Sequence, residues 1–184
     1  MAQFDIIISG FGGQGIQAAG KLLAYVGMLE NKYVSFLPSY GPEMRGGTSN
    51  CHVIISDEPI GSPILNSATV VIAMNRPSLD KFESFLAPGG ILLVDSSLVN
   101  RSVSRKDIKA IEIPASRIAS DMGNQAFANI VMLGKLISET GVVTPEYFEK
   151  GLKKILPENK HYLVPEEMKA LRLGMNYSSV AAQV

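Results

Sequence analysis

The chain has 184 residues, of which 46% are hydrophobic and 18% charged, and its 17 Lys and Arg balance its 17 Asp and Glu. This composition excludes a disordered chain and argues against a general nucleic-acid or anionic-membrane binder. We expect one domain over residues 1–184, in which backbone amides and one or two cations hold any bound anion locally. The missing net charge favours a subunit of an assembly, because repulsion between copies is absent.

In chain order, the sequence first predicts a strand, a glycine turn and a helix. Residues 4–9 are apolar and β-branched, which is typical of a central strand buried on both faces. Glycines follow, and small or apolar residues then recur at helical spacing over residues 16–26. A second strand is expected over residues 33–37, followed by a loop over residues 38–47 that is too rich in Pro and Gly for regular structure.

The middle of the chain predicts two more strands and a helix. Residues 48–56 suit a strand that is antiparallel at an edge, because no helix separates it from the strand before. Residues 57–67 are rich in turn formers, and residues 69–74 form another buried strand. Pro77 is placed in the first turn of a helix that continues to Leu86, and the Pro-Gly-Gly at 88–90 stops it.

Strands over residues 91–94 and 108–113 complete the pattern, and the last third of the chain is predicted to be helical. The helices are expected over residues 124–141, 144–157 and 165–175, with about 157–184 as a C-terminal helical extension. Alternating strands and helices predict an α/β fold: a doubly wound, Rossmann-like, mostly parallel sheet with helices on both faces.

The first candidate site is the G-x-G-x-x-G segment over residues 10–15, between the first strand and helix. Glycines let the backbone approach a phosphate, and the helix N-terminus offers free amides and a positive dipole end. The alternative is that the glycines serve only close helix–strand packing. An NAD or FAD site needs an acid about 20 residues on, at the end of the second strand. That end is Leu37-Pro38-Ser39, so another phosphate-bearing ligand fits better.

The second candidate site is the segment over residues 39–48, which leaves the end of the second strand where open sheets bind ligands. Arg45 lies between flexible residues and can fork onto a phosphate, while Tyr40 offers a ring to stack on a base. The alternative is that Glu43 and Arg45 pair with each other or with another subunit.

The remaining candidates are weaker. His52 and His161 are far apart in the sequence and lack partners for a catalytic triad or a metal site. Cys51, the only cysteine, excludes a disulfide framework or a cluster site in this chain, and we expect it to be a small buried hydrophobe rather than a reactive thiol. Asp95 is expected to cap the next turn rather than meet a ribose or an amine. We therefore expect no catalysis by this chain alone.

Residues 10–15 with 18–23, followed by 38–48, resemble the gamma subunit of 2-oxoacid:ferredoxin oxidoreductases, and the resemblance extends from Phe4 to near Leu156. It implies a subunit of an enzyme that converts a 2-oxoacid and coenzyme A to an acyl-CoA and CO2, with electrons passed to ferredoxin. The implied partners are alpha, beta and delta subunits. Thiamine diphosphate, Mg and 4Fe–4S clusters are expected in those partners only.

The resemblance also implies that this subunit binds coenzyme A, which is a substrate. The residues expected to line its site are Gly12, Gly13, Gln14, Gly15, Ser39, Tyr40, Arg45, Gly46, Gly47 and Thr48. The motif over residues 41–48 is more similar to the 2-oxoglutarate group than to the pyruvate group, and branched-chain oxoacid (ketoisovalerate) and indolepyruvate enzymes stay open. The alternatives are a stand-alone nucleotide-binding module and a structural docking subunit, and pairing of isolated copies is also open.

The N-terminus has no charged segment before an apolar stretch, and no apolar run reaches the length needed to cross a bilayer. We therefore expect a cytoplasmic protein.

Overall fold

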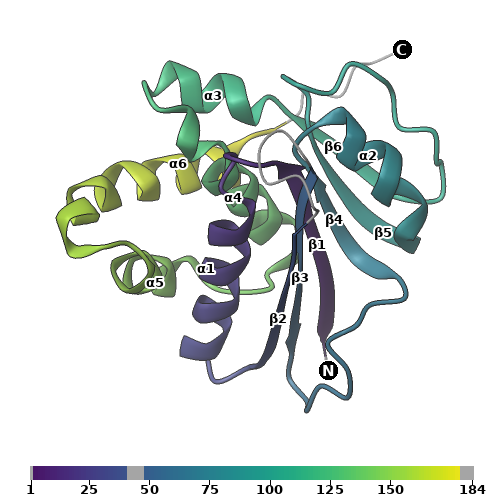
Figure 1. The fold of residues 1–184 in the computed structure, drawn as a ribbon, viewed down its shortest axis with the longest axis horizontal. Coiled ribbons are helices and arrows are strands. Elements are labelled where there is room, and N and C mark those ends of the chain that lie inside the picture. The colour runs from purple at the N-terminus through teal and green to yellow at the C-terminus, as the bar shows by residue number, and fades with distance from the viewer. Residues whose placement is uncertain (1, 41–47, 179–184) are drawn as a thin grey trace.

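The structure is a computed structural model that describes residues 2–40 and 48–178. Six strands form one sheet in the order β2-β3-β1-β4-β5-β6 (Figure 1). The strands are β1 (Gln3–Phe11), β2 (Tyr33–Tyr40), β3 (Thr48–Ser56), β4 (Ala68–Ala73), β5 (Leu86–Asp95) and β6 (Lys109–Ile113). β4 is parallel to β1 and β5, and β5 to β6, whereas β3 is antiparallel to β1 and β2. The predicted mostly parallel α/β sheet is confirmed.

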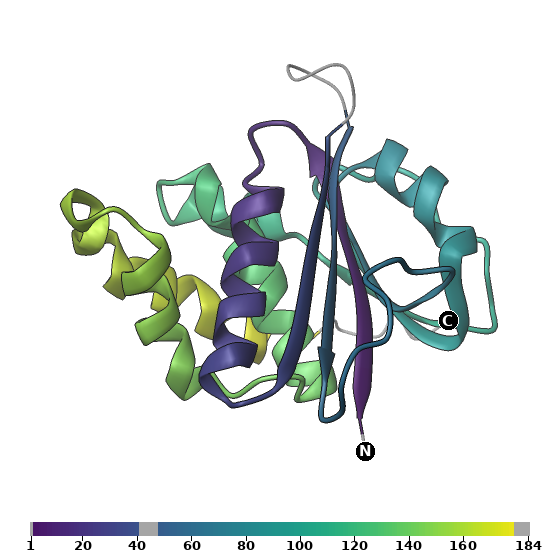
Figure 2. The same ribbon diagram turned by 60° about the horizontal axis from the view of Figure 1, so that its bottom comes forward.

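Helices cover both faces of the sheet (Figure 2). They are α1 (Ile16–Leu29), α2 (Arg76–Phe82), α3 (Ala115–Asp121), α4 (Ala128–Thr140), α5 (Phe148–Ile155) and α6 (Val164–Asn176), with 3-10 turns η1 (Glu83–Phe85), η2 (Gln125–Phe127), η3 (Pro145–Tyr147) and η4 (Glu158–Leu163). α1 and α4 lie on one face with α5 and α6 outside them, and α2 lies on the other. Ile6 and Ile8 of β1 pack toward α1 and α4, whereas Ile7 packs toward α2, which explains the continuous apolar run.

Three parts of the sheet differ from the sequence prediction. β3 is antiparallel as predicted but is not at the edge, because it pairs along its length with both β1 and β2, which leaves β2 at the edge. β2 continues to Tyr40 instead of ending at Leu37. The predicted helix stops at Phe82, and β5 already begins at Leu86, opposite Ala68, despite the Pro-Gly-Gly that follows. A positive φ of 75° at Gly89 lets the strand pass that segment.

α3 was not predicted, because its seven residues are too few for a helical period to be visible. Asp95, at the end of β5, joins two turns. Its carboxylate accepts a hydrogen bond from the backbone N–H of Ser97 (3.1 Å), in the turn that follows β5. It also accepts from the N–H and the hydroxyl of Ser116 (3.1 and 2.5 Å), in the first turn of α3. The expected capping role of Asp95 is thus confirmed. Asn124 also caps as predicted, since its side chain accepts from the N–H of Ala126 (3.0 Å).

α6 packs closely on α4. An added Cβ at Gly134 of α4 would lie 2.1 Å from the carbonyl oxygen of Leu171, and one at Gly174 of α6 would lie 1.9 Å from that of Val131. The two backbones therefore touch where they cross, which only glycine permits. This contact holds α6 against α4.

Candidate functional site

The candidate site lies at the carboxyl ends of β1 and β4, which are neighbouring parallel strands. After β1 the chain enters α1 on one face of the sheet, and after β4 it enters α2 on the other (Figure 2). The two connections diverge, and such switch points are where open α/β sheets bind ligands.

The glycine loop over residues 10–15 leads into α1 with an open N-terminus. Gly15 is the N-cap residue with a left-handed φ of 72°, and it offers no side chain to cap the helix. The first intrahelical hydrogen bond runs from the N–H of Ala19 to the carbonyl of Gly15 (2.9 Å). The amides of Ile16, Gln17 and Ala18 thus have no partner within the helix, and the helix dipole adds positive potential there.

Two amide side chains hold the glycine loop in place. Gln14 accepts a hydrogen bond from the N–H of Phe11 through Oε1 (2.6 Å) and donates through Nε2 to the carbonyl of Met74 (3.3 Å), so it links the loop to the end of β4. Asn129 of α4 donates through Nδ2 to the carbonyls of Gln14 (3.0 Å) and Gly15 (3.2 Å). Both side chains position the loop. The N–H groups of Phe11 and Gln14 are hydrogen-bonded within it, whereas those of Gly12, Gly13 and Gly15 have no partner among the described residues and can donate to an anion.

Gln17 joins the two predicted candidate segments. Its Nε2 donates to the hydroxyl of Ser49 (3.0 Å) and the carbonyl of Asn50 (2.8 Å), and lies 3.5 Å from the carbonyl of Ser39. Thr48 pairs with Phe11 across β3 and β1. The structure therefore brings Ser39, Tyr40 and Thr48 to the same end of the sheet as Gly12, Gly13, Gln14 and Gly15, whereas Arg45, Gly46 and Gly47 lie outside the described residues.

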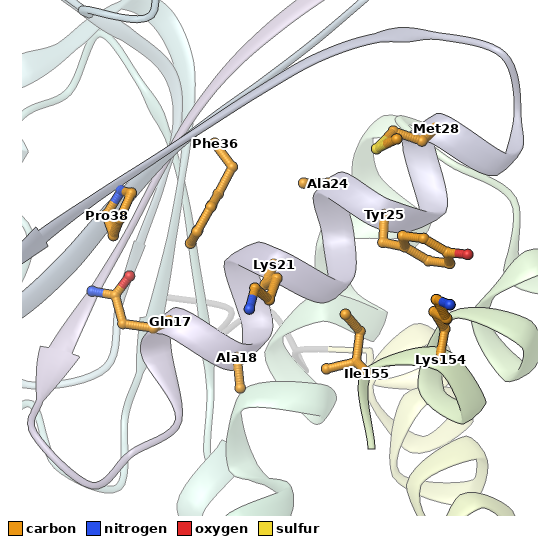
Figure 3. A pocket seen from close by; sticks show the side chains of 10 residues that line it. All are labelled: Gln17, Ala18, Lys21, Ala24, Tyr25, Met28, Phe36, Pro38, Lys154 and Ile155. Carbon is orange, nitrogen blue, oxygen red and sulfur yellow. The ribbon is translucent and has the colours of Figure 1, made fainter. Parts of the chain in front are cut away.

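A groove of about 810 Å³ runs along α1 beside this site. Figure 3 shows the α1 side chains in the middle, with Phe36 and Pro38 of β2 on one side and Lys154 and Ile155 of α5 on the other. Lys21 of α1 also lines the groove. The groove combines apolar walls with two lysine amines, so it can accept an extended ligand that carries negative charge.

Two smaller cavities flank Gly13 and Gln14. The first, here called the inner cavity, has a volume of about 230 Å³ and lies between α1, the start of α4, α5 and the first turn of α6. Its polar and glycine lining comes from Gly13, Gln14, Gly15, Asn124, Asn129, Lys160 and Glu167, and its apolar walls come from Leu22, Phe127, Ile130, Leu152, Ile155, Leu156 and Leu163. The second has about 250 Å³ and includes Leu98, Ser116 and Gln125. Ala18 and Ile155 line both the inner cavity and the groove, so the two adjoin.

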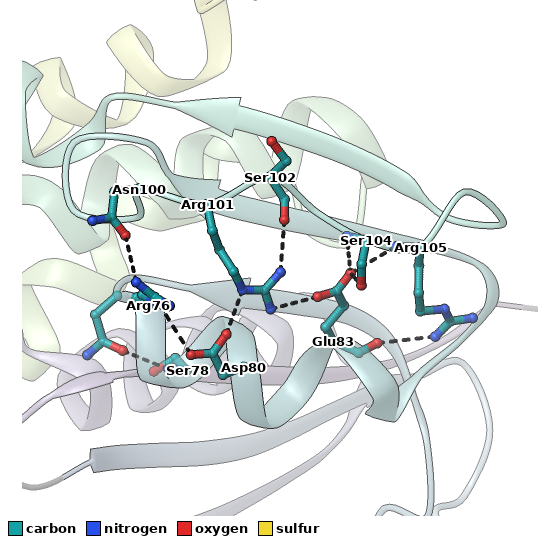
Figure 4. A network of polar contacts seen from close by, with 10 residues as sticks. Arg76, Ser78, Asp80, Glu83, Asn100, Arg101, Ser102, Ser104 and Arg105 are labelled. Atoms are coloured by element: carbon teal, nitrogen blue, oxygen red, sulfur yellow. Dashed lines mark hydrogen bonds and ion pairs between the residues drawn. The ribbon is translucent and has the colours of Figure 1, made fainter.

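The segment that carries Leu98 is fastened to α2 and η1 by a polar network (Figure 4). The Arg101 guanidinium lies between Asp80 (2.5 Å) and Glu83 (2.7 Å), and the backbone N–H groups of Ser104 and Arg105 donate to Glu83 (2.6 and 2.9 Å). Burial raises the pKa of Glu83, but these hydrogen bonds outweigh it and lower the pKa to about 2. Glu83 is therefore a charged anchor of the fold.

The reactive side chains of the described residues do not gather into a catalytic group. Burial raises the pKa of the Cys51 thiol to about 12, so this cysteine is a buried apolar residue as expected. Burial and the nearby Lys81 lower the pKa of His52, whose Nδ1 is buried without a partner. Within residues 2–40 and 48–178, no three His, Cys, Asp or Glu side chains are grouped to hold a metal ion. In the same ranges, no helix is long and apolar enough to cross a membrane.

The fold and this loop together define a class: α/β proteins with a glycine-rich turn and an uncapped helix N-terminus at a topological switch point. The family model described as pyruvate ferredoxin/flavodoxin oxidoreductase matches residues 5–177. The chain belongs to this family, which confirms the resemblance found in the sequence.

Relatives and solved structures agree with this family. The ketoisovalerate oxidoreductase subunit VorA of Methanothermobacter thermautotrophicus is 39% identical over 173 residues, which are 93% of this chain but 35% of that protein. This chain therefore spans about a third of that relative's length. The 2-oxoglutarate synthase subunit KorC of Methanocaldococcus jannaschii is 38% identical over 89% of this chain and 95% of that protein.

Among solved structures, the gamma subunit of a keto/oxoacid ferredoxin oxidoreductase from Geobacter sulfurreducens has a TM-score of 0.82 and 34% identity, covering 95% of both chains. The 2-oxoglutarate:ferredoxin oxidoreductase of Magnetococcus marinus, described with 2-oxoglutarate, coenzyme A and succinyl-CoA bound, has a TM-score of 0.86 at 20% identity. The match covers 95% of this chain and 31% of that one, and it shows the shared fold.

Sequence reasoning missed Gln17 and Asn129 as residues of this site, and it did not consider Glu167. Asn129 is the polar residue among the apolar residues that begin α4, and this break in the pattern was the available signal. The sequence gives no sign that the Asn129 side chain bonds the backbone of Gln14, 115 residues away.

Proposed function

We propose that this chain is the gamma subunit of a multi-subunit 2-oxoacid:ferredoxin oxidoreductase and that its glycine loop and the adjoining groove hold coenzyme A. The enzyme would convert a 2-oxoacid and coenzyme A to an acyl-CoA and CO2, and two electrons would pass to ferredoxin. The observation that carries the proposal is the uncapped N-terminus of α1 at the switch point, in a loop held by Gln14 and Asn129. Such amides suit the diphosphate of coenzyme A.

The proposed coenzyme A site keeps the two walls expected from the sequence. The backbone of Gly12, Gly13, Gln14 and Gly15 surrounds the diphosphate, and Ser39, Tyr40, Arg45, Gly46, Gly47 and Thr48 form the second wall. Lys21 and Lys154 in the adjoining groove provide positive charge for a ligand with three phosphates. The Magnetococcus protein, described with coenzyme A bound, supports this proposal.

We place the redox chemistry in partner subunits. Thiamine diphosphate, Mg and 4Fe–4S clusters would belong to alpha, beta and delta subunits, with ferredoxin as the acceptor of the complex in the cytoplasm. Cys51 supports this arrangement, because it is the only cysteine of the chain and is buried with a raised pKa.

The proposed oxoacid is 2-oxoglutarate, supported by the relative KorC, a 2-oxoglutarate synthase subunit covered over 95% of its length. The test measures ferredoxin reduction by the complex purified with this chain, using 2-oxoglutarate, ketoisovalerate, pyruvate and indolepyruvate. The highest kcat/KM is expected for 2-oxoglutarate. A higher value for ketoisovalerate would reassign the substrate and leave the coenzyme A site untouched.

The coenzyme A site is tested by isothermal titration of the full chain with coenzyme A and with NAD. Binding of coenzyme A but not NAD is expected, and the reverse result refutes the proposal. In the assembled enzyme, Arg45→Ala should raise the KM for coenzyme A, because one guanidinium–phosphate contact contributes about 1.5–3 kcal/mol. Loss of assembly with normal kinetics would instead identify the residue as part of a docking surface.

A further inference from the structure

The edge of the sheet at β2 is long and carries no charge. β2 is an edge strand (Figure 1), and its eight residues, YVSFLPSY, include no charged side chain. The opposite edge strand, β6, exposes Lys109 and Glu112, and charges of this kind keep an edge from pairing with another chain. The exposed large side chains of β2 are instead Tyr33 (50% exposed) and Leu37 (37%). Within residues 2–40 and 48–178, no strand pairs with the outer side of β2, so this edge is open to another strand.

The direction of the β2 backbone groups follows from the neighbouring strands. The N–H of Asp5 in β1 donates to Thr69 Oγ1 (2.9 Å), on the β4 side, and thus points away from β3. Asp5 lies opposite Ile54, so the backbone groups of Ile54 point the other way, toward Ser35 of β2. Because direction alternates along a strand, Ser35 bonds β3, whereas Val34 and Phe36 direct their N–H and C=O groups outward.

Pro38 narrows the ways in which this edge can pair. It belongs to the same outward-directed set as Val34 and Phe36, but it has no N–H to donate. A second β2 that runs antiparallel avoids Pro38 if Val34 of each copy faces Phe36 of the other. Each of these pairs then exchanges both of its N–H···O hydrogen bonds. In this register Ser35 of one copy meets Ser35 of the other on a twofold axis.

The side chains match in the same register. Val34 would lie against Phe36 on the face toward α1, and both are apolar and only partly buried in the single chain. Tyr33 would lie against Leu37 on the other face, which covers the two exposed side chains of the strand. The 17 cations and 17 anions of the chain balance, so two copies do not repel each other. Each position from 33 to 37 thus meets a residue of its own chemistry, which favours a second copy over an unrelated strand.

We propose that two copies of this chain pair through β2 about a twofold axis at Ser35, which joins their two six-stranded sheets into one. The groove along α1 shares Phe36 with the paired segment and would therefore border the interface. The inference rests on the strand edge alone and does not depend on the proposed function.

The mass of the full chain in solution is the first test. Sedimentation equilibrium over a range of protein concentrations should show a species with twice the 19.8 kDa of the chain. A monomer at every concentration overturns the proposal.

Charge at the axis tests where the copies meet. Ser35→Lys places two like charges directly opposite each other and should weaken association on the order of a hundredfold. Ser35→Glu should do the same. An equimolar mixture of the two variants should restore the dimer, because opposite charges then meet at the axis. Ala110→Lys, on the exposed part of β6, is the matched control and should sediment like the unmodified chain.

A cysteine at the axis tests the register. Opposed residues of a non-hydrogen-bonded antiparallel pair have Cα atoms about 4.5 Å apart, which a disulfide can bridge. Ser35→Cys should therefore form a disulfide-linked dimer on mild oxidation. Cys51 does not compete, because it is buried and its pKa is raised to about 12. Ala110→Cys, the control, should stay unlinked under the same conditions.

The outcomes separate this inference from a folding defect and from the proposed function. Far-UV circular dichroism establishes that each variant is folded before its mass is interpreted. A dimer that persists in Ser35→Lys and Ser35→Glu, or a Ser35→Cys variant that does not cross-link, overturns the proposed interface. A monomer that binds coenzyme A refutes the pairing alone, and a dimer that does not bind it refutes the coenzyme A site alone.

Discussion

Replacing Gly15 by alanine tests whether Asn129 locks the glycine loop. Gly15 has a φ of 72°, and an added Cβ would lie 2.2 Å from Asn129 Nδ2. The left-handed conformation costs alanine about 1–2 kcal/mol. Displacing Asn129 also breaks its hydrogen bonds to the carbonyls of Gln14 and Gly15, at about 0.5–1.5 kcal/mol each. Gly15→Ala should therefore lower the free energy of unfolding by about 2–5 kcal/mol.

A matched control isolates the contact from the strain. Gly141 also has a left-handed φ, 61°, but an added Cβ there meets nothing within 4 Å, so Gly141→Ala should cost only about 1–2 kcal/mol. Urea denaturation gives both values. Asn129→Ala should relieve part of the cost of Gly15→Ala. The double variant should therefore lose less free energy of unfolding than the two single variants lose together. Equal losses for the two glycine variants, with additive behaviour of the pair, would refute the lock.

Three further predictions follow from other parts of the molecule. Because the pKa of Glu83 is about 2 in the folded chain, against 4.5 ordinarily, its contacts should contribute about 3 kcal/mol above pH 4.5 that is lost as the pH falls toward 2. When the free energy of unfolding is measured between pH 4.5 and pH 2, it should fall less steeply with pH for Glu83→Gln than for the unmodified chain. An equally steep fall would contradict the lowered pKa of Glu83. Gly174→Ala should separate α6 from α4 and cost about 1–3 kcal/mol by urea denaturation, whereas unchanged stability would mean that the helices are not in contact. Cys51 should resist iodoacetamide at pH 8 until the chain unfolds, and alkylation at the rate of a free thiol would show that it is accessible.

Local patterns were enough to predict the class of fold and most of its elements. The apolar run before the glycines, the helical spacing after them and the cap at Asn124 each depend on neighbouring residues, so the sequence displays them directly. The position of β3 inside the sheet depends instead on which strands pair, and no local pattern encodes that choice. α3 has the same difficulty, because the side chain that holds its first turn, Asp95, belongs to another element.

The candidate site was predictable where it is made of backbone and unpredictable where it is made of distant side chains. The glycine spacing predicted a helix N-terminus with free amides, and in the structure the N-terminus of α1 has no side-chain cap. The side chains that hold it, Gln14 and Asn129, act on carbonyls that only the folded chain brings near. Glu167 looks like an ordinary first-turn acid in the sequence, and only the folded structure reveals that it is buried beside a cavity.

The crossing of α4 and α6 has a consequence for folding during synthesis, because α6 is made after α4. The inner cavity joins the glycine loop, near the start of the chain, to a helix near its end. On the ribosome, most of the sheet and α1 can fold while the last helix is still unsynthesised, and the side of α4 that meets Leu171 is then exposed to water. A nascent chain or a truncated product that stops before α6 would have an incomplete inner cavity and an exposed apolar face on α4. Chaperones bind exposed apolar surface of this kind.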